Sequence, residues 1–535
     1  MKTGYTFILL LLILHKVPVL GAEPLTGESF RLADQAYKAV ATGDLDRANS
    51  SLQAALRLSP DHPQLLALLA QIQSLRNENE AAAQTLDRAL ALEPDNARML
   101  AQRGYLHISR NNHDGAISDF RDALRTGQLT DQEARNIALA LADLHAGDGH
   151  YKEAIQTIAP YVTASDTQAT VKWQSYLIYD GKLPPDNTLI DSPEVNYALV
   201  SKAYEALSED DDVQALKLFQ IAERHGGLTA LQYGDAGYAA RGLFDNREAD
   251  RLFRAAIDAN QNEPDQEKSY APRELFGLRR AVDDLNRYWG LIVSDSISPG
   301  GQTGLGMAGL PGFPRGRGSK GDINQIGSEI YFQPPGIGYR DGSQLQFFIR
   351  NFQTLDDQSG GADGIETNQG SLGVRWKPLR EYNLVLTAER LISIGALADD
   401  DWLLRVGFSI DHGVDIKPYL DRWPYRTLFA EAAYITGQGR NIDTLEARWG
   451  YSFRLPVPDK LVFTPHLVFA ADVDTAAVEE VAAGIGVGAS VRWWFRESLH
   501  RAPASYIDFT VQYREGLIDD AIRQDGTFFR FTLWY

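Results

Sequence analysis

The stretch T-L-E-A-R-W-G-Y-S-F-R-L at residues 444–455 decides the fold of the second half of the chain. One face would carry Leu445, Ala447, Trp449, Tyr451, Phe453 and Leu455, and the other Glu446, Arg448, Gly450, Ser452 and Arg454. Successive side chains of a strand point to opposite faces, so an apolar face lies opposite a charged or small one. Aromatic residues gather near the strand ends on the apolar face, which is typical of a strand that crosses a membrane in a barrel.

The same alternation recurs along the whole region from residue 288 to the end of the sequence. We count twelve strands, at 288–298, 325–333, 343–354, 370–377, 382–394, 402–410, 426–436, 444–455, 460–470, 481–496, 505–514 and 527–535. The last one follows the pattern Phe529-x-Phe531-x-Leu533-x-Tyr535, similar to the terminal assembly signal of bacterial outer-membrane barrels. The sequence therefore predicts an antiparallel transmembrane β-barrel of about twelve strands at 288–535.

An even strand number places both ends of the barrel on the same side of the membrane, which we expect to be the periplasmic side. Tight turns are predicted at 378–381 and 456–459 on that side, with extracellular loops at 299–324, 356–369 and 515–526. Residues 411–425 are long for a periplasmic turn. A strand would be most easily miscounted there.

Composition narrows the possible functions. The 535 residues carry a net charge of −19, which argues against nucleic acid as a ligand. Cysteine is absent, so disulfides, thiol catalysis and a lipid-modified cysteine are excluded together. The mean hydropathy of −0.28 is compatible with a barrel, because only alternate residues of each strand face lipid.

Residues 1–22 have the composition of a signal peptide. Lys2 gives a positively charged start, and residues 7–14 form an apolar run. Leu20-Gly21-Ala22 ends in the small residues that are typical of a cleavage site. We expect an exported protein that begins near Glu23.

From residue 23 to 287 the pattern is helical and repeats every 34 residues. The recurring sets are Ala48, Ala82 and Ala116; Leu52, Leu86 and Phe120; and Ala55, Ala89 and Ala123, with Ala36, Ala70 and Gly104 at a matching small position. Small residues are needed where paired helices cross closely, and 34 is the period of the tetratricopeptide repeat, which this region resembles. We predict an α-solenoid of about six repeats. Its ligand-binding face is not assigned by these residues, which are expected to form the core.

The last two predicted repeats are marked by Ala215, Phe219 and Ala222 and, 34 residues later, by Ala249, Phe253 and Ala256. The fourth-to-fifth junction, 161–193, is irregular, and 260–287 forms a polar, proline-containing passage to the barrel.

The C-terminal part resembles the domain family named after the bacteriophage adsorption protein NfrA. The resemblance is carried by Arg492-Trp493-Trp494-Phe495, His500-Arg501-Ala502-Pro503 and Tyr506-Ile507-Asp508-Phe509-Thr510. It implies a periplasmic solenoid joined to a barrel in the outer membrane of a Gram-negative bacterium. It also implies an exopolysaccharide route served by an inner-membrane glycosyltransferase, and a phage attachment site. This chain has a much shorter solenoid than that family.

Charged side chains on the predicted inner face are the candidate pore-lining residues. The basic ones are Arg350, Arg375, Lys377, Arg405, Arg448, Arg454, Arg492, Arg496, Arg514 and Arg530, and the acidic ones Glu329, Glu389, Asp411, Glu431, Glu446 and Asp508. Ten basic against six acidic groups favour a lining for an anionic or hydroxyl-rich polymer. The alternative is a network of salt bridges that fills a narrow lumen.

No pattern indicates an enzyme, a cofactor or a metal centre. The ten histidines are scattered, and no serine lies in a nucleophile elbow. Calcium binding by the acidic run 399–401 stays open. The family resemblance, rather than any single residue, favours a non-enzymatic exopolysaccharide conduit. The alternatives are a structural or receptor protein with a plugged barrel, whose solenoid gathers envelope partners, and a barrel enzyme acting on lipids, which would need a Ser–His pair at the membrane rim.

Overall fold

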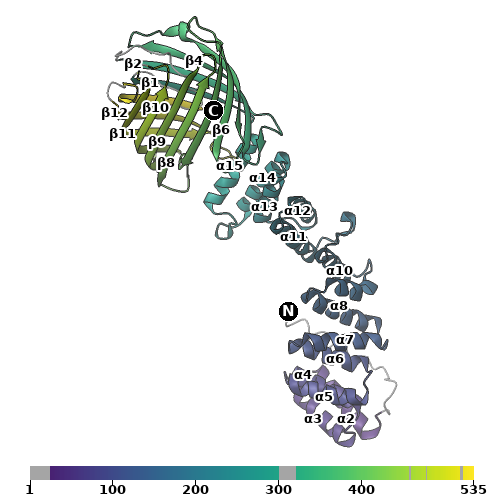
Figure 1. Ribbon diagram of the computed structural model, residues 1–535. Coiled ribbons are helices and arrows are strands. Elements are labelled where there is room, and N and C mark those ends of the chain that lie inside the picture. Colours follow the sequence, from purple (N-terminus) through teal and green to yellow (C-terminus); the bar gives the residue numbers. More distant parts are fainter. Residues whose placement is uncertain (1–24, 300–320, 457–459, 478, 519–521) are drawn as a thin grey trace. The chain divides into compact units, whose positions relative to one another are not determined.

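The computed structural model describes residues 25–299, 321–456, 460–477, 479–518 and 522–535 (Figure 1). The predicted signal peptide, most of the predicted loop 299–324 and most of the turn 456–459 lie outside these residues. The chain forms two compact units. One ends at Tyr204 and also takes in Ile221–Gly227, and the other holds Glu205–Gln220 and Leu228–Tyr535.

Helices occupy the described chain from Gly27 to Asn286. They are α2 (Gly27–Ala41), α3 (Leu45–Leu58), α4 (Pro63–Leu75), α5 (Asn79–Leu92), α6 (Ala97–Ser109), α7 (His113–Arg125), α8 (Asp131–Gly147), α9 (Tyr151–Ile158), α10 (Thr167–Tyr179), α11 (Pro193–Ser208), α12 (Asp212–Gly226), α13 (Ala230–Gly242), α14 (Asn246–Asn262) and α15 (Pro272–Asn286). The hairpins α2/α3, α4/α5, α6/α7, α8/α9 and α13/α14 pack closely. The passage 260–287, predicted as a polar, proline-containing link to the barrel, contains α15. Pro272 is its first residue and Glu274 accepts from the Ala271 N–H at 2.9 Å.

The 34-residue period is visible in the core and in the turns. Ala48, Ala82 and Ala116 are completely buried, as are the matching residues of the other two predicted sets apart from Leu86 at 1%. Within three hairpins the turn residue is left-handed, with φ of 78° at Gly43, 61° at Asn77 and 56° at Asn111. Glycine and asparagine tolerate that conformation best, so the turn chemistry repeats with the core.

Gly104 shows why one hairpin needs glycine where two others have alanine. A Cβ at Gly104 would lie 2.6 Å from Cε1 of Phe120, whereas the hairpins with Leu52 and Leu86 have room for Ala36 and Ala70. The larger Phe120 ring therefore occupies the space of the missing methyl group.

We expect Gly104→Ala to destabilise the solenoid by about 1–3 kcal/mol, because overpacking outweighs the gain in helix propensity. Thermal unfolding of the full-length protein, followed by the helical circular dichroism signal, measures this. Gly147→Ala is the matched control, because Gly147 is exposed in α8 with nothing within 4 Å of its Cβ position. An equally stable Gly104→Ala protein would contradict the close contact.

The second part of the chain is a β-sheet closed on itself. Its strands are β1 (Trp289–Pro299), β2 (Asp322–Phe332), β3 (Tyr339–Arg340), β4 (Ser343–Asp357), β5 (Gln369–Lys377), β6 (Asn383–Ser393), β7 (Trp402–His412), β8 (Arg422–Ile435), β9 (Arg440–Arg454), β10 (Leu461–Asp474), β11 (Val481–Phe495), β12 (Ser505–Gly516) and β13 (Gly526–Trp534). Sequential neighbours pair antiparallel, β1 pairs with β13, and β2 pairs with β4 around the two-residue β3. The predicted fold class, a helical solenoid followed by an antiparallel barrel of twelve strands, is confirmed.

The connection 413–421, between β7 and β8, is the place where a miscount was expected. It is a nine-residue segment on the same barrel end as α15, and the strand number is unaffected. The strand faces follow the alternation: Trp449 and Leu467 are 61% and 56% exposed on the outer face, whereas His466 is buried inside. Within the described chain, every helix is too short or too polar to cross a membrane.

Candidate functional site

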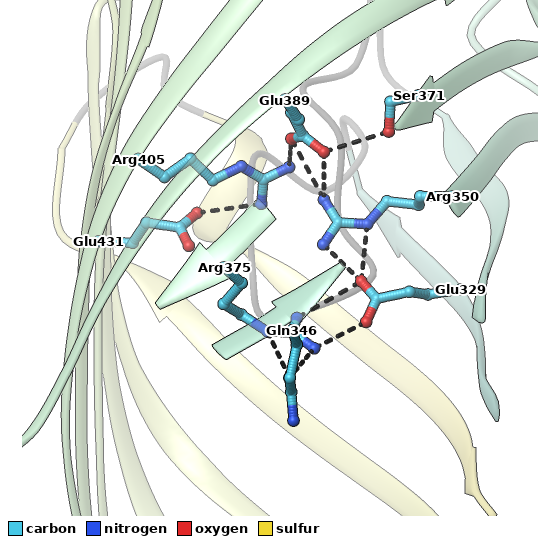
Figure 2. A network of polar contacts seen from close by, with 8 residues as sticks. All are labelled: Glu329, Gln346, Arg350, Ser371, Arg375, Glu389, Arg405 and Glu431. Carbon is cyan, nitrogen blue, oxygen red and sulfur yellow. Dashed lines mark hydrogen bonds and ion pairs between the residues drawn. The ribbon is translucent and has the colours of Figure 1, made fainter. Parts of the chain in front are cut away.

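A network of ion pairs joins inward-facing side chains of six strands in one half of the barrel (Figure 2). Arg350 on β4 donates to Glu329 on β2 at 2.7 Å and to Glu389 on β6 at 3.2 Å. Arg375 on β5 donates to Glu329 at 2.9 Å, and Arg405 on β7 donates to Glu389 at 2.6 Å. Arg405 also lies 3.6 Å from Glu431 on β8. We call these six residues, with Gln346 and Ser371, the Glu389 network.

The Glu389 network is electrically balanced and deeply buried. It holds three arginines and three carboxylates, and Glu329, Arg350 and Glu389 are only 0–2% exposed. Two neutral side chains add hydrogen bonds: Gln346 accepts from Arg375 at 2.8 Å and Ser371 donates to Glu389 at 3.1 Å, whereas Nε of Arg405 is buried without a partner among the described residues. Buried charges are tolerated when they are paired and hydrogen-bonded in this way. A cavity of about 80 Å³, lined by Arg350, Arg375, Arg405 and Glu431 among others, lies beside the network and has room for several water molecules.

The other half of the lumen holds a second network around Glu446 on β9. Its carboxylate lies 2.5 Å from Arg448, 2.7 Å from Arg514 on β12 and 3.9 Å from Arg530 on β13. The pair Glu446–Arg514 joins strands that are not neighbours in the sheet, so it bridges the inner face of β10 and β11. We call Glu446 and these three arginines the Glu446 network.

A separate pair, Arg492 with Asp508 at 2.9 Å, lies on the neighbouring strands β11 and β12. Together with the Glu446 network it places four arginines against two carboxylates, so this half of the lumen is positively charged.

Further ion pairs lie at the barrel end opposite α15. Arg440 on β9 pairs with Asp474 on β10 at 2.6 Å. Arg523, in the connection between β12 and β13, pairs with Asp472 at 2.8 Å, and the neighbouring Gln524 donates to the same carboxylate at 2.8 Å. This connection therefore folds back onto inward-facing groups of β10.

At its other end the barrel is covered by α15, which we call the floor helix. Arg279 donates to Glu497 at 2.9 Å and to the carbonyl of Arg501 at 2.9 Å. Arg280 donates to Asp415 at 2.5 Å and to the carbonyl of Pro503 at 2.9 Å. Charge-assisted bonds of this kind are among the stronger hydrogen bonds in proteins. The floor helix is thus held to two of the turns on this end, 413–421 and 496–504.

An apolar contact also holds the floor helix against the barrel. Phe276 of the floor helix belongs to a buried cluster with Ile416, Trp423, Val462, Trp494 and Ala502. Trp423 also donates from Nε1 to the carbonyl of Gly413 at 2.9 Å. The floor helix therefore shares a hydrophobic core with the barrel end that it covers.

Asp284 of the floor helix makes the stability of the protein depend on pH. Burial raises the pKa of this carboxyl to about 6, against the opposing effect of Arg280 and Arg287, while Asp283 and Asp415 raise it further. A carboxyl with a folded pKa above its unfolded value binds protons more readily in the folded state. The stability of the protein should therefore rise as the pH falls through about 6.

Asp284→Asn is expected to stabilise the protein at pH 7.5 by about 1–2 kcal/mol, because two pKa units correspond to about 2.7 kcal/mol before solvent screening. At pH 5 the gain should be about half as large, because the unfolded carboxyl is still ionised there, and it should disappear only below about pH 4. Urea unfolding in detergent micelles at both pH values measures the difference, with Asp265→Asn, a largely exposed site, as control. A gain that is the same at both pH values would contradict this assignment.

Most of the pore-lining candidates lie inside the barrel. The inward-facing residues held in ion pairs are Arg350, Arg375, Arg405, Glu431, Glu446, Arg448, Arg492, Asp508 and Arg514. Arg454 lies at the rim, paired with Asp421 at 2.7 Å. Lys377 and Asp411 lie at the same end, near the floor helix, with Lys377 donating to the Gly342 carbonyl at 3.3 Å.

Arg496 is a correction to the predicted inner face. It follows the end of β11 with φ of 60°, so the alternation of the strand no longer applies, and its guanidinium lies over the Tyr535 ring at 4.2 Å.

Sequence reasoning missed two sets of residues. Arg440, Asp472 and Asp474 were left out because β9 and β10 were expected to be shorter than they are. Their alternation with the inward-facing Glu446 and His466 was a usable signal. The arginines of the floor helix were missed because their partners, such as Asp415, lie in turns far away in the sequence.

The carboxylates of the acidic run 399–401 accept hydrogen bonds within and between the loops. Asp399 accepts from Gln438, Asp400 from Ser393, and Asp401 from the Gly437 N–H at 2.8 Å. Among the described residues there is no group of three His, Asp or Glu side chains placed to hold a metal ion.

Comparisons with known proteins agree with this architecture. Residues 39–103 and 101–169 each match a tetratricopeptide repeat family, and residues 360–531 match the family described as Bacteriophage N adsorption protein A C-term. No curated protein matches this chain.

Similar solved structures cover the helical part. A tetratricopeptide repeat protein from Parabacteroides merdae is 19% identical, covers 47% of this chain and 99% of its own, and has a TM-score of 0.28. The pilF protein of Pseudomonas aeruginosa is 15% identical, covers 44% and 93%, and has a TM-score of 0.24. Scores this low carry no functional information. The family models match two parts of the chain: tetratricopeptide repeats at 39–103 and 101–169, and the C-terminal family of the bacteriophage N adsorption protein A at 360–531.

Proposed function

We propose that the protein is a non-enzymatic outer-membrane scaffold, with a closed barrel as its anchor and the tetratricopeptide solenoid as its working part in the periplasm. The observation that carries the proposal is the Glu389 network, in which three arginines and three carboxylates are paired and buried across six strands. A lumen that passed a polymer would need these side chains to face water.

The solenoid supports the scaffold role. Tetratricopeptide repeats stack into extended concave surfaces that bind other proteins. The match to a phage adsorption family supports a second role for the barrel, as a cell-surface attachment site for a bacteriophage. Neither role requires an open lumen or a cofactor.

A second candidate is the export of an exopolysaccharide delivered by an inner-membrane glycosyltransferase. The positively charged half of the lumen favours it, because four arginines against two carboxylates would suit an anionic or hydroxyl-rich polymer. This candidate requires the floor helix to leave the barrel end and both networks to rearrange during transport.

A disulfide lock on the floor helix separates the two candidates. The chain has no cysteine, so a pair introduced by Arg279→Cys and Ala502→Cys is the only one present. The two positions adjoin, since the Ala502 N–H donates to the Arg279 carbonyl at 3.2 Å. Under the scaffold proposal, cells with the locked protein secrete as much polymer as cells with the single-cysteine controls. Secretion that falls with the lock and returns with reductant would instead support export.

A further inference from the structure

We infer that the outer face of the barrel carries a binding site for the phosphate headgroup of a membrane lipid, formed by Arg426, Arg422, His412 and Trp449. The site lies where β7, β8 and β9 adjoin, towards the end covered by the floor helix. It rests on the proposed membrane location and adds a specific lipid contact to it.

The strand register places the four residues on one face. Arg426 lies beside His412 of β7 and beside Trp449 of β9, and Arg422 lies four residues earlier on the same strand as Arg426. Leu428, Ala430 and Ala432 continue the same face, and the alternate residues Trp423 and Tyr425 are buried inside. All four side chains of the site are exposed.

Trp449 orients the central arginine. The Arg426 guanidinium lies 5.9 Å from the centre of the Trp449 ring, within the range of a cation–π contact. Such a contact holds the planar guanidinium against the barrel wall while its N–H groups stay available. A guanidinium presents donors in a fork that fits two phosphate oxygens at once.

Arg422 and Arg426 differ from the arginines in the lumen in whether a carboxylate pairs with them. Arg350, Arg405 and Arg514 each have carboxylate partners within 3 Å or little more. Arg422 and Arg426 have none among the residues that the structure describes. The nearby Asp421 is taken by Arg454 at 2.7 Å. The site therefore presents positive charge that no carboxylate of the described chain balances.

The depth of the site indicates what balances the charge. An arginine on the lipid face is costly at the bilayer midplane but costs little near the interface, where lipid phosphates lie. Arg426 is the fifth residue of β8 counted from the floor end, and Arg422 is the first. Long arginine side chains extend towards the headgroup layer from such positions. A phospholipid of the periplasmic leaflet is thus the occupant that the position and charge fit.

The test is lipid titration of the full-length protein in detergent, followed by native mass spectrometry. The probes are phosphatidylglycerol and monoglucosyl-diacylglycerol, which has similar chains and no phosphate. We expect wild type to retain phosphatidylglycerol preferentially. Arg422→Gln with Arg426→Gln should weaken that retention about twenty-five-fold, since each basic residue near an anionic headgroup contributes about a fivefold factor. Arg380→Gln, which removes a paired arginine from another turn at the same barrel end, should leave it unchanged.

Equal retention of the two lipids by wild type, or equal binding by the double variant and wild type, would overturn the headgroup site. Inorganic phosphate that displaced the lipid completely would overturn the lipid as occupant. Heat-modifiable mobility on gels reports independently on the barrel. A heat-modifiable protein without lipid preference refutes this site alone, whereas a protein that stays soluble without detergent refutes the proposed membrane anchor.

Discussion

Barrels that carry Glu389→Gln are expected to lose about 3–5 kcal/mol of stability, because removing one partner leaves buried charges unpaired. Glu389 is completely buried and accepts from both Arg350 and Arg405. Glutamine has nearly the same volume and keeps one acceptor, so the loss reports on charge rather than on packing. Urea unfolding of the folded protein in micelles, followed by gel mobility without heating, measures the change.

A surface pair provides the control for this experiment. Asp421→Asn removes the carboxylate that pairs with Arg454, but the Asp421 side chain is 90% exposed. Exposed pairs contribute about 0–1 kcal/mol. Equal effects of Glu389→Gln and Asp421→Asn would show that water reaches the Glu389 network, and the filled lumen would then be wrong.

Glu446→Gln is expected to have a still larger effect, at or above the upper end of the same range of about 3–5 kcal/mol. Glu446 is the carboxylate shared by Arg448, Arg514 and Arg530, so its neutralisation leaves three guanidinium groups facing one another. The Glu389 network would keep two carboxylates after the corresponding change, whereas the Glu446 network would keep none.

This difference suggests a specific rescue. Small anions such as sulfate should recover part of the stability of the Glu446→Gln barrel, because they can sit among three unpaired arginines. Sulfate should help the Asp421→Asn control no more than it helps wild type. A Glu446→Gln barrel as stable as wild type would contradict the buried pair between β9 and β12.

Much of the fold was predictable from local pattern. The inward and outward faces followed from alternation, since a strand turns each side chain by half a turn relative to the last. Ala48, Leu52 and Ala55 marked the solenoid core through spacing alone. Both signals depend on nearest neighbours in sequence, and both were confirmed in the structure.

The site was less predictable because its chemistry depends on partners across the lumen. Alternation places Arg514 and Glu446 on the inner face, but only the closure of the barrel and the stagger of its strands bring them to 2.7 Å. The floor helix is a similar case. Its arginines bind carbonyl groups of the turn 496–504, and a backbone acceptor leaves no signature in the sequence.

Conductance in planar lipid bilayers tests the closed barrel most directly. With the lumen filled by two ion-pair networks and one end covered by the floor helix, wild-type protein should insert without steady ion conductance. The amount of inserted protein can be established by its heat-modifiable mobility after recovery from the membrane. A stable, ohmic and anion-selective conductance of the wild-type protein would contradict the closed barrel and favour the exopolysaccharide conduit.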